Sequence, residues 1–151
     1  MGIKAKAAEE YFLKGANCSQ AVLAAFHQEA GMDMETALKI ASSFGAGMGR
    51  LREVCGALSA VFMIAGFQYG YSDLDDADAK AAHYKLIQDL AREFKEKNGS
   101  ILCRGLLGLD EAEQSWVPET RSKSYYENRP CLEIVKNTAD MIETYMNKNK
   151  K

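Results

Sequence analysis

The chain has 151 residues, of which 47% are hydrophobic and 26% charged, a composition typical of globular proteins rather than disordered or fibrous ones. Its formal net charge of -2 provides no electrostatic basis for binding nucleic acid or an anionic membrane surface. This length suits one domain, so we expect a single helical domain over residues 1–151, with a frayed tail at 148–151.

The N-terminal sequence lacks the apolar segment typical of a secretory signal. The longest apolar stretch, residues 57–67, is much shorter than the roughly 20 residues that a membrane-spanning helix requires. We therefore expect a cytoplasmic protein with no membrane insertion, no nucleic-acid partner and an unknown redox partner. The apolar stretch could serve a homodimer as readily as the core of a monomer.

Helical periodicity dominates the sequence, and no convincing strand pattern occurs, so the expected fold class is an all-α bundle of about five to seven helices. The first three helices are predicted over residues 4–13, 17–30 and 34–43. Asn17 and Asp33 are suitable N-cap residues for the second and third helices. Gly31 is predicted to end the second helix.

The glycine-rich segment 45–50 (GAGMGR) interrupts this pattern and allows a sharp turn or a close backbone approach. No strand precedes it, which argues against a dinucleotide-binding loop. Further helices are predicted over about residues 53–69, from after residue 73 to residue 97, and from the N-cap Ser100 to residue 107. An irregular polar segment is expected over 108–128, and a last helix from Pro130 to about Tyr145.

The most informative residues are the four cysteines, none of which forms a CxxC pair: Cys18, Cys55, Cys103 and Cys131. Their spacing excludes zinc-ribbon, thioredoxin-type and CxxCH haem-attachment sites. Each cysteine falls in the first turn of a predicted helix, where free N–H groups and the helix dipole favour the thiolate. In the reducing cytosol, permanent disulfides are disfavoured. We therefore predict that all four form one shared catalytic, cofactor-binding or metal-binding site.

The stretch from Gly47 to Ala60 (GMGRLREVCGALSA) resembles the signature of the C_GCAxxG_C_C family of redox-active proteins, also described by the motif CGAxxG. Members carry one cysteine before this motif and two after it, in the order seen here. The segments Asn17–Val22 and Cys103–Gly108 are also similar to the family pattern. Ala60 stands where the family has its closing glycine. In a helix, alanine is small enough to keep nearly the same close packing as glycine.

This resemblance implies a redox activity that depends on the four cysteines. Genes of the family often lie beside transporter genes. A related domain accompanies the split-Soret type of cytochrome c, which implies an iron–sulfur cluster on the cysteines. Three versions of the centre therefore stay open: an iron–sulfur cluster, a tetrahedral zinc site, or a metal-free dithiol–disulfide pair. The protein would accordingly be an oxidoreductase or an electron carrier.

A rival interpretation is a non-catalytic helical binding module, such as a transporter accessory, with structural cysteines or structural zinc. Cysteine is also a small, commonly buried apolar residue, so its presence alone proves no chemistry. The relative positions of the four sulfur atoms in space separate the two interpretations.

Overall fold

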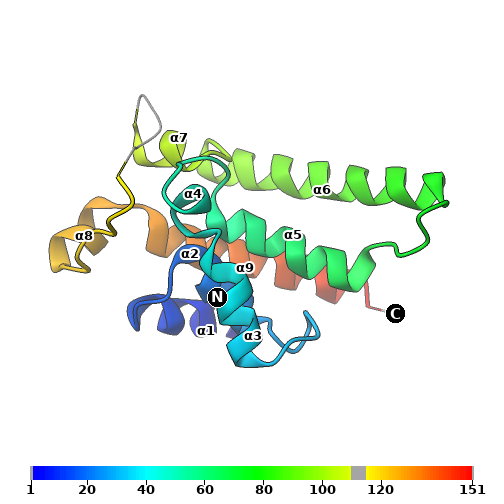
Figure 1. Ribbon diagram of the computed structural model, residues 1–151, viewed down its shortest axis with the longest axis horizontal. Coiled ribbons are helices and arrows are strands. Elements are labelled where there is room, and N and C mark those ends of the chain that lie inside the picture. The colour runs from blue at the N-terminus through cyan, green and yellow to red at the C-terminus, as the bar shows by residue number, and fades with distance from the viewer. Residues whose placement is uncertain (1, 110–114, 151) are drawn as a thin grey trace.

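The computed structural model describes residues 2–109 and 115–150, and this part of the chain holds nine helical segments. They are α1 (Ile3–Leu13), α2 (Cys18–Ala25), α3 (Met34–Ser42), α4 (Gly45–Met48), α5 (Gly56–Tyr69), α6 (Ala77–Asn98), α7 (Cys103–Leu107), α8 (Lys123–Asn128) and α9 (Cys131–Lys148). No strand occurs among the described residues, which confirms the predicted all-α class (Figure 1).

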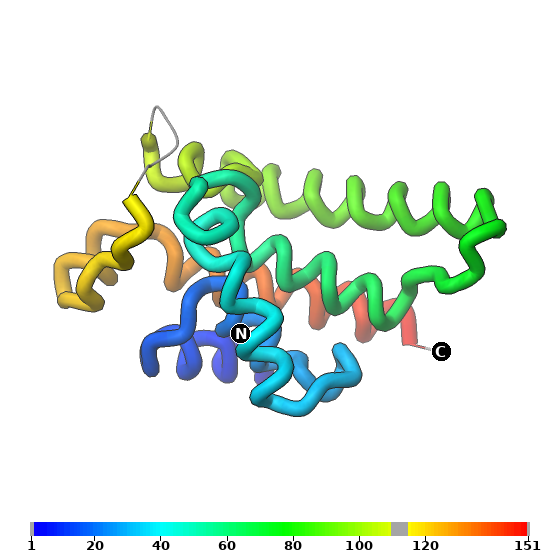
Figure 2. The backbone as a smooth tube through the Cα atoms, viewed as in Figure 1, coloured from blue at the N-terminus to red at the C-terminus, as the bar shows by residue number. Residues whose placement is uncertain are grey.

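The core forms around α2 and α5, which pack against each other and against α9. Val22 and Leu23 of α2 and Leu58 and Val61 of α5 are completely buried, because both helices carry apolar side chains on every face. α1 covers α2 and α9, and α6 lies along α5 (Figures 1 and 2). None of the described helices combines the length and the apolar character needed to cross a bilayer.

The starts of α5, α7 and α9 lie at one end of the molecule. α5 and α9 both begin near α4, and α6 returns along α5 to deliver the chain into α7 at this same end (Figure 2). α4 packs against α2, α5 and α7. The bundle therefore brings together the N-termini of helices that are far apart in the sequence.

Several predicted boundaries are wrong, each for a local reason. α2 ends at Ala25 rather than residue 30, because the chain turns at Phe26, whose N–H bonds to the carbonyl of Leu23. Ser100 is not the N-cap of α7; its hydroxyl accepts from the N–H of Leu102, which itself precedes the helix. α8 lies within the segment predicted to be irregular, residues 110–114 of which lie outside the described residues.

The glycine-rich segment forms a left-handed turn. From Ala46 to Arg50, every residue has a φ between 57° and 72°, and Arg52 follows with a φ of 60°. The N–H of Gly49 bonds to the carbonyl of Gly45, as in a helix, but with the opposite hand. Each residue other than glycine is destabilised by roughly 1–2 kcal/mol in this conformation. The turn is therefore strained at its non-glycine positions and is stabilised by contacts with the surrounding helices.

A candidate thiol centre at four helix starts

All four cysteines stand where helices begin, as the sequence predicted. Cys18, Cys103 and Cys131 are the first residues of α2, α7 and α9. Cys55 is the N-cap of α5, slightly earlier than the expected first turn. A helix start offers backbone N–H groups and the positive end of the helix dipole, and backbone N–H groups bond to the sulfurs of Cys18 and Cys55.

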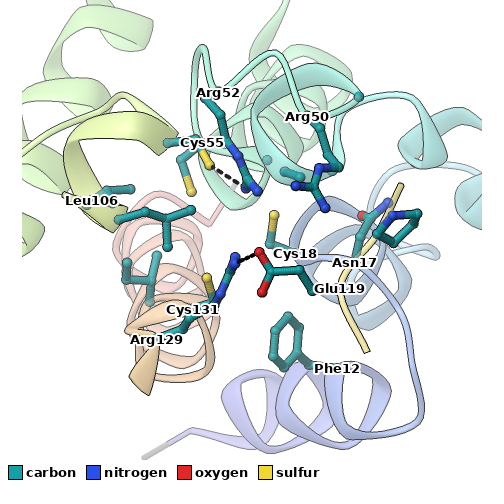
Figure 3. Close-up of a pocket in the computed structure, with 18 of the residues that line it drawn as sticks. Phe12, Asn17, Cys18, Arg50, Arg52, Cys55, Leu106, Glu119, Arg129 and Cys131 are labelled. Atoms are coloured by element: carbon teal, nitrogen blue, oxygen red, sulfur yellow. Dashed lines mark hydrogen bonds and ion pairs between the residues drawn. The ribbon is translucent and has the colours of Figure 1, made fainter. Parts of the chain in front are cut away.

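The four cysteines line one cavity of about 250 Å³, although up to 113 residues separate them in sequence. Figure 3 shows Cys18, Cys55 and Cys131 entering this space from three different helices. Gly45, Ala46 and Gly49 also line it, so the left-handed turn forms part of its wall. Four cysteines that are far apart in the sequence therefore border the same cavity.

Several hydrogen-bond donors surround the sulfur of Cys18. Backbone N–H groups of Ser19, Ala46 and Gly56 bond to its sulfur, and the thiol of Cys55 does so as well. The Cys55 bond is the strongest influence, and together these donors lower the pKa of Cys18 to about 6 despite burial. The side chain is partly exposed to the cavity. Cys18 is therefore a thiolate near neutral pH, which is the nucleophilic form of cysteine.

Cys55 differs from Cys18 in that its pKa is raised. Its side chain is only 6% exposed, and its thiol donates to Cys18. The hydrogen bond to Cys18 and burial raise the pKa of Cys55 well above its ordinary value. One proton is thus held between two sulfur atoms, on Cys55, beside an ionised Cys18.

A short backbone pairing places Cys103 beside Cys55. Val54 and Leu102 form an isolated antiparallel bridge, in which the Cys55 N–H bonds to the carbonyl of Ile101 at 2.8 Å. The Cys103 N–H bonds to the carbonyl of Glu53 at 2.6 Å. Because side chains alternate along extended backbone, Cys55 and Cys103 lie diagonally on the same face of this bridge, where neighbours are ~7 Å apart.

Arg52 supplies a positive charge to this part of the cavity. Its guanidinium donates to the sulfur of Cys103 at 3.5 Å, and only 2% of the residue is exposed (Figure 3). Burial raises the pKa of Cys103, and Arg52 opposes that rise. For Cys131, burial dominates and raises the pKa to about 12. Cys103 and Cys131 are therefore thiols at neutral pH.

The segment between the described residue 115 and α8 borders the cavity on its outer side. Arg121 donates to the carbonyls of Phe12 and Ala16, both at 2.9 Å, and stacks over the Phe12 ring. Arg129 pairs with Glu119, and Arg50 donates to the carbonyl of Val117. Trp116 lines the cavity while staying 83% exposed. This segment is thus tied to α1 and to the left-handed turn by arginine side chains.

Sequence reasoning missed the groups that set the chemistry of Cys18. The amides of Ala46 and Gly56 carry no side-chain signal, and only the glycine-rich composition of 45–50 and the Gly56 of the motif point to a close approach. Glu53, two residues before Cys55, pairs with Arg104 at 3.1 Å. Its side chain does not line the cavity, whereas its carbonyl orients Cys103.

The residues do not fit a metal centre as they stand. Among residues 2–109 and 115–150, no group of three or more histidine, cysteine or acidic side chains is arranged to hold one metal ion. Cys18 and Cys55 are engaged with each other, and burial keeps Cys103 and Cys131 protonated. A four-thiolate site for an iron–sulfur cluster or zinc would require these side chains to move together and ionise.

The described residues form an all-helical fold in which four cysteines line one cavity. The chain belongs to the family described as "Putative redox-active protein (C_GCAxxG_C_C)", which it matches over residues 16–145. This match confirms the resemblance seen in the motif around Cys55. No curated protein and no solved structure shows a significant match to the chain.

Proposed function

We propose that the protein is a thiol–disulfide redox protein whose reactive pair is Cys18 and Cys55. The single observation that carries this proposal is that Cys18 and Cys55 line the same cavity, where the Cys55 thiol bonds to Cys18 and lowers its pKa. The backbone amides of Ser19, Ala46 and Gly56 complete a cradle around the Cys18 sulfur. A nucleophilic thiolate, partly exposed to a cavity, stands next to a buried thiol that can follow it. This arrangement meets the requirements of two-step disulfide exchange.

In the first step, the Cys18 thiolate attacks one sulfur of a substrate disulfide. A bond forms between Cys18 and that sulfur, the substrate S–S bond breaks, and the other half leaves as a thiolate. In the second step, Cys55 loses its proton and attacks the Cys18 sulfur, which releases the first half as a thiolate. The substrate gains two electrons, and the protein is left with a Cys18–Cys55 disulfide.

The cradle around Cys18 supports both steps. The amides of Ala46 and Gly56 hold the thiolate in place before attack. The high pKa of Cys55 keeps this thiol protonated and unreactive until Cys18 has reacted and no longer carries negative charge. The order of reaction, Cys18 before Cys55, therefore follows from their opposite surroundings.

Single-turnover reaction of the reduced protein with oxidised glutathione tests this proposal. Wild type should release both halves of the disulfide as glutathione and form a Cys18–Cys55 bond as its first intramolecular disulfide. Cys55→Ser should instead stop at a stable glutathione adduct on Cys18, visible as a mass increase. Cys18→Ser should form no adduct at comparable rate, whereas Cys131→Ser should behave as wild type.

Two results contradict the proposal. If Cys18→Ser reacts as fast as wild type, Cys18 is not the nucleophile; if the wild type itself does not react, the protein is better described as a binding module. If protein purified without oxygen contains stoichiometric iron with sulfide, or stoichiometric zinc, and loses it in Cys18→Ser, the thiols serve a metal centre. Elemental analysis and a visible absorption spectrum make that distinction.

A further inference from the structure

The proposed pair leaves two thiols of the same cavity without a role. Cys103 lies diagonally from Cys55 across the bridge of Val54 and Leu102, and the Cys55 thiol is hydrogen-bonded to Cys18. Cys55 therefore has a cysteine neighbour on each of two helix starts, those of α2 and α7. Cys103 is also the one whose sulfur receives a hydrogen bond from a buried guanidinium, that of Arg52.

We infer that Cys103 takes the disulfide from Cys18, so that oxidation of the reactive pair is passed inward to a Cys55–Cys103 disulfide. This inference rests on the proposed function. In the step, Cys103 loses its proton to water and its thiolate attacks the Cys55 sulfur. The Cys55–Cys103 bond forms, the Cys18–Cys55 bond breaks, and Cys18 departs with the electron pair as a thiolate. No external oxidant or reductant is consumed.

Two features of the site give this step its direction. Attack at Cys55 expels Cys18, whose amide cradle from Ala46 and Gly56 is ready to receive a thiolate again. A thiol of low pKa is the better leaving group in such exchange, and the pKa of Cys18 is about 6. Arg52 stabilises negative charge on Cys103 as that residue becomes the nucleophile.

The consequence is functional. The new disulfide is buried, since Cys55 and Cys103 are 6% and 8% exposed. Cys18 is returned to the cavity as a thiolate while the chain still holds the oxidising equivalents. Cys103 is thus a second reacting cysteine, and Arg52 acts as a positioning residue through it.

Disulfide mapping tests the inference. Reduced full-length protein receives one equivalent of diamide without oxygen, is quenched with N-ethylmaleimide in acid at increasing times, and is digested with trypsin, which places each cysteine in a separate peptide. In wild type, Cys18–Cys55 should form first and then be replaced by Cys55–Cys103, in about tenfold excess at equilibrium. In Cys103→Ser, Cys18–Cys55 should accumulate, and Cys131→Ser should match wild type.

Arg52→Gln should slow the transfer about tenfold without affecting the first disulfide, and Arg52→Lys should restore much of the rate. Circular dichroism checks that each variant is folded, and the wild-type mapping stands even where a variant is not. Persistence of Cys18–Cys55 in wild type, or transfer to Cys131, overturns the inference and leaves the proposed function intact. Failure of Cys18–Cys55 to form even in Cys103→Ser overturns the proposed function itself.

Discussion

The sulfur of Cys18 lies against the α-carbon of Gly56, at the start of α5. A Cβ atom at position 56 would stand 2.6 Å from that sulfur and 2.6 Å from the carbonyl oxygen of Phe44. Glycine at this position therefore admits the Cys18 thiolate to the end of α5 and allows the Gly56 N–H to reach it. Gly56, which follows Cys55 in the motif, thus makes room for the sulfur of Cys18 and donates its N–H to it.

Gly56→Ala should destabilise the protein and weaken the cradle of Cys18. The added methyl group meets backbone and a buried sulfur, which cannot yield as a flexible side chain could, so we expect a loss of about 1–3 kcal/mol in the free energy of unfolding. Urea denaturation under reducing conditions measures it. Gly66→Ala is the matched control on the same helix, because a Cβ there meets nothing within 4 Å. That variant should gain about 0.5–1 kcal/mol, and equal losses at both positions would contradict this account.

The reactivity of Cys18 should follow an unusually low pKa. We expect its alkylation by iodoacetamide to reach half its maximal rate near pH 6, as opposed to 9.0 for an ordinary cysteine. Cys55→Ala removes the donor that contributes most and should move the midpoint upward, whereas Cys55→Ser keeps an O–H donor and should move it less. Mass spectrometry of the peptide containing Cys18 gives the rate at each pH. A midpoint near 9 in wild type would show that no such cradle exists in solution.

The stability of the fold should depend on pH through Cys18. Its pKa falls from 9.0 to about 6 on folding, so between these values the unfolded chain binds a proton that the folded chain lacks. The contribution of the thiolate to stability therefore grows as pH rises through this window and is lost as pH falls through 6. The other three cysteines have raised pKa values and stay protonated there.

Urea denaturation of wild type and Cys18→Ser under reducing conditions measures this effect, at about pH 6 and about pH 8. The difference in unfolding free energy between the two proteins should shift in favour of wild type at the higher pH. A difference that stays constant with pH would mean that Cys18 is not ionised in the fold.

Ala46→Gly should stabilise the protein, although glycine usually weakens a helical segment. Ala46 has a φ of 57°, which costs an L-residue roughly 1–2 kcal/mol and glycine little. Its N–H to Cys18 is kept, so the alkylation midpoint of Cys18 should not change. Ala82→Gly, at an exposed site within the right-handed α6, makes the same substitution and should lose about 1 kcal/mol. Thermal unfolding shows whether each variant is more or less stable than wild type. If Ala46→Gly is destabilised, the backbone at Ala46 is not strained.

Local patterns in the sequence predicted most of the longer helices and the placement of the cysteines near their starts, but neither α4 nor α8. Asn17 and Asp33 cap their helices through side-chain bonds to Gln20 and Thr36, as expected from residue type. Such capping depends on neighbours within a few positions, which is why it can be read along the chain. The all-α class and the helix-start positions of the cysteines follow from the same short-range physics.

Only the tertiary structure determined which cysteine becomes the thiolate. All four occupy similar helix starts, yet Cys18 alone receives amides from two remote segments, at Ala46 and Gly56. The left-handed turn that supplies Ala46 is strained and forms because α2, α5 and α7 surround it. Burial and long-range hydrogen bonds set each pKa, and neither is encoded in the residues adjacent to a cysteine.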